Sequence, residues 1–215
     1  MVIAIIAIIA ALLFPVFSQA KQAAKKASCT SNMHQLGVAM TLYMADSDDR
    51  YPLGHAPVAD PLQDFTEGGG YEMHQIDLLR PYVKNKKDEG VWRCPGDANK
   101  LYEREGANSE LKVSYSVNAW FEYGAPASQV EQPAEKVYNH ESPDDDHCHW
   151  WMIGRTQPSD PYLTYNQIPR DKFNEQFAPD RHNKGSNFLY ADQHVKWAAM
   201  SRLWGTTRET SAFWP

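Results

Sequence analysis

MVIAIIAIIAALLFPVF, residues 1–17, is the stretch that decides the fold. It holds no charged and no polar side chain, and Pro15 is its only interruption. A helix that is apolar on every face leaves no polar stripe for water, which argues against a core helix of a soluble domain. Because a lysine-bearing helical pattern follows without a turn signal, we expect a membrane-inserting helix that continues into a folded domain.

The helical pattern continues from residue 18 to about Asp46. Apolar residues recur with spacings that alternate between four and three, which predicts one apolar stripe along a helix. The members of the stripe are Cys29, Met33, Leu36, Met40 and Tyr43. Such a helix is roughly 70 Å long at about 1.5 Å per residue, too long for one domain of this size to bury.

The first third of the helix must therefore contact lipid or other copies of the chain. We expect two parts: residues 1–24, the exposed apolar half of the helix, and residues 25–215, a globular head that includes the other half. The residues expected in the core of an assembly are Ile3, Ile5, Ile6, Ile8, Ile9, Leu12, Leu13, Phe14, Pro15 and Phe17.

Several motifs, in a fixed order, carry a resemblance to a known family. After the apolar start come Cys29–Thr30–Ser31–Asn32 with His34–Gln35–Leu36–Gly37, then Arg93–Cys94–Pro95–Gly96–Asp97, Ser114–Tyr115–Ser116–Val117–Asn118, and His182 with Asp192 nine residues further on. Together they resemble the bacterial type IV pilin-like proteins that have a prepilin-type start and a C-terminal H-x9-DG motif. Gln193 departs from that motif, which has glycine there.

The resemblance implies an α+β fold in which a long N-terminal α-helix packs on a small antiparallel β-sheet head. It also implies a structural, non-enzymatic subunit of a pilus-like extracellular filament, held in the inner membrane before assembly. The expected partners are further copies of the chain and the pilus or secretion assembly machinery. A type II secretion pseudopilin is an alternative within the same class. In that family the mature chain is methylated and starts about seven residues earlier, so we expect a processed N-terminus upstream of Met1.

The head should be rich in loops. The strand candidates are short, at residues 113–119, 137–141, 150–153, 187–191 and 194–198. The last two alternate around Asp192–Gln193, which predicts a two-residue hairpin, although a tight turn of that kind favours glycine. The net charge is −6 and no basic stripe is present, so nucleic-acid binding is not expected.

Three cysteines outside the cytoplasm allow one disulfide and one free thiol. The resemblance favours a Cys29–Cys94 bridge, because both residues lie in family-like motifs. A Cys94–Cys148 bridge and three reduced, buried cysteines are the alternatives.

The most chemically suggestive segment is His140–His149, HESPDDDHCH. Its residues Asp144, Asp145, Asp146 and His147 could hold Ca²⁺, or Zn²⁺ as a second choice. A solvated acidic loop is the alternative, and no cofactor is otherwise implied. We expect His182 to be structural and to bond a carboxylate such as Asp192 or Glu141.

No nucleophile elbow, P-loop or dinucleotide fingerprint is present, so an enzyme is not expected. A membrane-anchored metal-dependent enzyme or binding module that uses the acidic loop is the competing hypothesis from another class.

Overall fold

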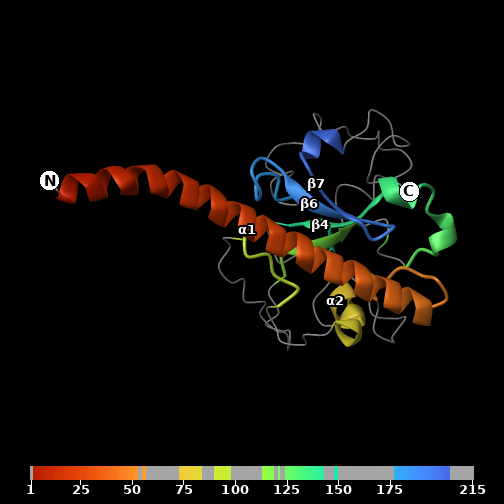
Figure 1. Ribbon diagram of the computed structural model, residues 1–215. Helices are drawn as coiled ribbons and strands as arrows, with labels where there is room; N and C mark the ends of the chain where they lie inside the picture. Colours follow the sequence, from red (N-terminus) through yellow and green to blue (C-terminus); the bar gives the residue numbers. More distant parts are fainter. Residues whose placement is uncertain are drawn as a thin grey trace, which may run out of the picture.

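One long helix and one small sheet organise the chain (Figure 1). The structure is a computed structural model, and it describes residues 2–52, 55–56, 73–83, 90–97, 113–118, 121, 124–142, 148–149 and 177–203. Helix α1 runs from Val2 to Asp46, and it ends where the acidic run begins, as the sequence predicts. Its C-terminal half lies on the head, and its N-terminal half projects beyond it in a gentle curve (Figure 1). Pro15 lies inside the helix.

The projecting half of α1 is exposed on all sides. Its large apolar side chains are between 54% and 83% exposed from Val2 to Phe17. By length and composition this part of α1 can cross a membrane. The fully buried positions of the helix start only at the first cysteine; they are Cys29, Met33, Leu36, Gly37, Ala39 and Met40.

The main sheet has the strand order β5-β3-β4-β6-β7. Strands β3 (Tyr115–Asn118), β4 (Val137–Glu141), β6 (Ser186–Tyr190) and β7 (Val195–Ala198) each pair antiparallel with their neighbours in that order, which confirms the predicted α+β fold. The edge strand β5 (Cys148–His149) departs from the expected pattern because it runs parallel to β3. The strand predicted at residues 150–153 lies outside the described residues.

Short elements surround this sheet. Strands β1 (His55–Ala56) and β2 (Met73–His74) form a separate antiparallel pair. Within the described residues, the other helical elements are α2 (Gln75–Leu79) and the 3-10 segments η1 (Arg80–Tyr82), η3 (Ala127–Gln129), η4 (Pro133–Glu135) and η6 (Met200–Arg202).

The core lies between α1 and the sheet. Gly37 of α1 sits against β6, where an added Cβ would lie 3.0 Å from Leu189 Cδ1, so the absence of a side chain allows this close approach. Beyond it, the rings of Tyr51, Phe121 and Tyr138 pack with centroids 4.7–5.5 Å apart. These aromatic contacts close the end of the core next to the C-terminus of α1.

The β6–β7 connection differs from the two-residue hairpin expected from sequence. The Gln193 N–H donates to Tyr190 O at 2.9 Å, and the Tyr190 N–H donates to His194 O at 2.9 Å. The loop therefore contains three residues, 191–193, and Gln193 has a φ of 76°. A turn followed by one left-handed residue is a common hairpin solution that usually places glycine there. The expectation of a two-residue loop was wrong because it counted residue 191 as part of the strand, whereas β6 ends at Tyr190.

Candidate functional site

A buried polar centre joins α1 to the head. We use this name for the Cys29–Cys94 disulfide together with Glu141, His182 and Asn187. The disulfide links α1 to the segment 90–97 with a Cα–Cα distance of 4.8 Å, and it is the pairing that the resemblance favours. One turn further along the helix, the Asn32 side-chain amide donates to Arg93 O at 2.7 Å. The helix is thus held to this segment by a covalent bond and a hydrogen bond.

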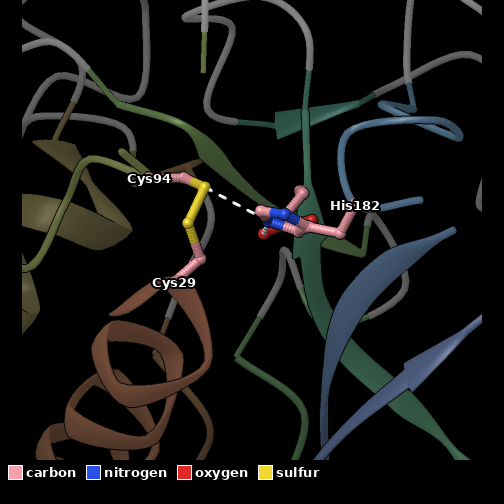
Figure 2. Close-up of side chains that lie close together, drawn as sticks. Cys29, Cys94 and His182 are labelled. Carbon is pink, nitrogen blue, oxygen red and sulfur yellow. Dashed lines mark hydrogen bonds and ion pairs between the residues drawn. A yellow bond between two sulfur atoms is a disulfide. The ribbon is translucent and has the colours of Figure 1, made fainter. Parts of the chain in front are cut away.

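His182 lies beside the disulfide (Figure 2). Its Nε2 atom is 3.4 Å from Cys94 Sγ and 2.9 Å from Glu141 Oε1, and the side chains of His182 and Glu141 are fully buried. Of the two carboxylates suggested by the sequence, Glu141 is the partner and Asp192 is not. The Nδ1 atom is buried and has no hydrogen-bond partner among the described residues.

Glu141 is the last residue of strand β4, and Asn187 of the neighbouring strand β6 holds its carboxylate by hydrogen bonds. Oε2 accepts from the backbone N–H of Asn187 at 3.0 Å, and Oε1 accepts from the Asn187 side-chain amide at 3.1 Å. The Thr30 hydroxyl of α1 lies 3.2 Å from Asn187 Oδ1. A buried carboxylate is tolerated only when it is hydrogen-bonded in this way. Glu141 therefore connects β4, β6 and, through Asn187, the long helix.

A charged pair lies next to the polar centre. Arg181 Nη2 is 3.2 Å from Asp97 Oδ2, and both side chains are less than a tenth exposed. The Ser114 hydroxyl donates to the same Asp97 oxygen at 2.7 Å, and Arg181 also donates to Ser114 O at 3.1 Å. The opposite charges of Arg181 and Asp97 balance each other. Both side chains also bond Ser114, which fixes the turn that carries His182.

Gly96 is where the cysteine segment passes closest to His182. An added Cβ would lie 2.7 Å from His182 Cε1 and 3.2 Å from Cys94 Sγ, so no larger residue fits without a shift. The Gly96 N–H points to Cys94 Sγ at 3.3 Å, and the Asp97 N–H donates to Cys94 O at 2.9 Å. The sequence Cys-Pro-Gly-Asp thus folds into a turn around the sulfur.

The centre and the adjoining pair collect residues from most of the sequence motifs. Cys29, Asn32, Cys94, Gly96, Asp97, Ser114 and His182 all come from motifs that carried the resemblance. Asp192 is not among them: it lies at the surface in the β6–β7 loop, where its Oδ1 is 2.6 Å from His194 Nδ1. The two ends of the H-x9-D motif therefore have separate roles.

Two buried tyrosines, Tyr115 and Tyr51, have raised pKa values. Burial, with the Glu141 carboxylate as the second cause, raises the pKa of Tyr115 well above its ordinary value. Burial and then Asp192 raise the pKa of Tyr51 to about 12. Both residues stay neutral phenols at ordinary pH.

The metal candidates predicted from sequence, Asp144 to His147, lie outside the described residues. The described residues instead bring four other potential ligand atoms together: the two sulfurs, a Glu141 oxygen and a His182 nitrogen all lie within 4.8 Å of one another. The sequence did not predict Thr30, Asn187 and Arg181 as neighbours of this group. The only signal for Arg181 was its place beside the motif histidine.

Comparison with known proteins gives one match. Residues 18–129 match the model of a family described as a protein of unknown function, DUF1559. This match includes the motifs at Cys29, Cys94 and Ser114, and it ends before His182. No match was found among curated proteins or among solved structures. Because the family model covers just over half of the chain, the protein belongs to the DUF1559 family of proteins of unknown function.

Proposed function

We propose that this protein is a structural, non-catalytic subunit of a type IV pilus-like filament, which polymerises through the N-terminal half of α1. The observation that carries the proposal is the exposed apolar surface from Val2 to Phe17, which projects beyond the head (Figure 1). Such a surface is unstable in water, because burying it is worth roughly 25 cal/mol per Å². It requires either lipid or further copies of the same helix.

The same surface serves both states in turn. Before assembly the apolar half of α1 anchors the chain in the inner membrane, and its length and composition suit that role. In the filament it packs against the equivalent helices of other copies, with the heads outside. Lipid is already apolar, so the gain on leaving the membrane comes mainly from close helix packing. The assembly machinery of a pilus or secretion system would supply the transfer.

A filament also needs a firm joint between the helix and the head. The Cys29–Cys94 bridge, the Asn32–Arg93 hydrogen bond and the contact between Thr30 and Asn187 all lie where α1 enters the head. A pull on the buried helix is therefore transmitted to β4 and β6 instead of to one loop. This arrangement supports a subunit that carries mechanical force in a filament, and it suits a secretion pseudopilin equally well.

The experiment is immunogold electron microscopy of the native cells with antibody against the head. Surface filaments labelled along their length, and lost when the gene is deleted and restored by its return, are the expected result. Label confined to the cell envelope, with protein secretion lost on deletion, would favour the pseudopilin alternative. Label on monomeric chains in the membrane with no assembly of either kind would contradict the proposal.

A further inference from the structure

We propose that the Cys29–Cys94 disulfide covers a latent site for a divalent transition metal, with Zn²⁺ the best chemical fit. In the reduced chain, Cys29, Cys94, Glu141 and His182 would supply two sulfurs, one oxygen and one nitrogen. This donor set is one that zinc accepts. None of these four residues belongs to the acidic segment 144–147, and the proposal does not depend on the filament function.

The spacing of the ligand atoms supports a single ion. Tetrahedral zinc, with bonds of about 2.0–2.3 Å, separates its ligand atoms by roughly 3.3–3.8 Å. Nε2 of His182 is 3.4 Å from Cys94 Sγ and 2.9 Å from Glu141 Oε1, and all four ligand atoms lie within 4.8 Å of one another. The two bonded sulfurs must move apart, which requires side-chain rotation at one or both cysteines.

Neighbouring groups already orient the potential metal ligands. Asn187 orients the Glu141 carboxylate with two hydrogen bonds, and the Gly96 N–H points at Cys94 Sγ, where it would stabilise a thiolate. Nε2 of His182 faces two acceptors, a sulfur and a carboxylate oxygen, although a single N–H can serve only one of them well. A cation between these three atoms would satisfy them together.

The chemistry has two steps. A dithiol reductant cleaves the Sγ–Sγ bond, gives two electrons and two protons to the cysteines, and becomes a disulfide itself. Zn²⁺ then replaces the two thiol protons, which pass to solvent. A disulfide oxidant reverses the change: it takes two electrons from the two thiolates and two protons from solvent and becomes a dithiol. The Sγ–Sγ bond forms again, both sulfur ligands are lost and the ion is released. The bridge and the metal are therefore mutually exclusive states of one site.

The test uses the full chain in detergent micelles, with Cys148→Ser as the background so that no third thiol interferes. The chain is refolded without oxygen, either oxidised or with a phosphine reductant, which is converted to its oxide with oxygen taken from water. One equivalent of Zn²⁺, or of Co²⁺ as a coloured probe, is present during refolding because the site is buried. Bound metal is measured after desalting, and circular dichroism reports folding.

We expect about one metal per reduced chain, with the Co²⁺ bands of a tetrahedral thiolate site, and none in the oxidised chain. His182→Ala should weaken binding at least tenfold, and a Cys29→Ser, Cys94→Ser chain should abolish it. Oxidised and reduced chains that bind equal amounts would overturn the proposal, since that metal would belong to the acidic segment or to the surface. Metal retained by the double serine variant, or a reduced chain that stays unfolded with zinc present, would overturn it too.

Discussion

Nε2 of His182 lies 2.9 Å from Oε1 of Glu141, and the side chains of both residues are completely buried. Removing one partner leaves the other buried with an unmade hydrogen bond, which costs about 1–3 kcal/mol and more for a charged group. We expect His182→Ala to lower the free energy of unfolding by about 3 kcal/mol, measured by urea unfolding of the full chain in detergent. His194→Ala is the matched control, because His194 pairs with Asp192 at the surface and such pairs contribute less than about 1 kcal/mol. Equal losses for the two variants would show that the buried pair has no special weight.

The Cys29–Cys94 bridge spans 65 residues of sequence. Closing a loop of that length in the unfolded chain stabilises the native state by about 4 kcal/mol in the chain-entropy model. Replacing both cysteines with serine should lower the melting temperature of the head accordingly, and Cys148→Ser is the control. The measurement is made with a chelator present, so that no metal takes part. If the control loses as much stability as the double variant, the bridge is not the element that holds α1 to the head.

Much of the fold could be predicted from sequence because its signals are local. The apolar start and the apolar stripe, with spacings that alternate between four and three residues, predict helix α1. The polar residues from Asp46 predict its end, and the helix ends there in the structure. The alternation around Asp192 located the β6–β7 hairpin but not its loop length. Gln193 has a left-handed conformation, and the usual sequence signal for that conformation is glycine, which is absent there.

The polar centre could be predicted only in part. Cys29, Cys94 and His182 stood out by their motifs, but the partner of His182 stayed open between Asp192 and Glu141. All five residues of β4 are buried, so β4 shows no alternation that would tell which side chain faces the helix. Asn187 meets Glu141, and Thr30 meets Asn187, only through the packing of β4, β6 and α1, which no local pattern encodes.

Gln193 offers a stabilising change. Its φ of 76° is a conformation that glycine adopts without steric cost, whereas other residues are strained by roughly 1 kcal/mol. We expect Gln193→Gly to raise the free energy of unfolding by about 0.5–1 kcal/mol, less a small loss of contact with Gly37. Gln129→Gly is the control: this exposed residue of η3 has no positive φ, and glycine there should destabilise. Destabilisation by both glycines would mean that the contact with Gly37 outweighs the strain.

Alkaline pH should unfold the head through its buried tyrosines. The pKa of Tyr51 is raised from 10.0 to about 12, mainly by burial, and its hydroxyl donates to Ala191 O at 3.1 Å. Since the unfolded chain loses this proton first, stability is fully present below pH 10 and falls as the pH rises toward about 12. Urea midpoints measured across this window, with tyrosinate absorbance as the second signal, should show the decline. Tyr51→Phe should make the decline shallower, and an unchanged slope would remove Tyr51 as a cause.

The most direct test of the filament account is one substitution on the exposed half of α1. Ile6→Asp places a carboxylate on a surface that is 60% exposed in the single chain and packed in the proposed filament, where an unpaired charge costs several kcal/mol. Ser128→Asp, at an exposed position of η3 on the head, is the control with the same added charge. The measurement is electron microscopy of surface filaments from cells that make each variant, alongside circular dichroism of each chain in detergent. The account predicts that Ile6→Asp abolishes filaments while the head stays folded, and that Ser128→Asp leaves them intact. Normal filaments from the Ile6→Asp chain would contradict it.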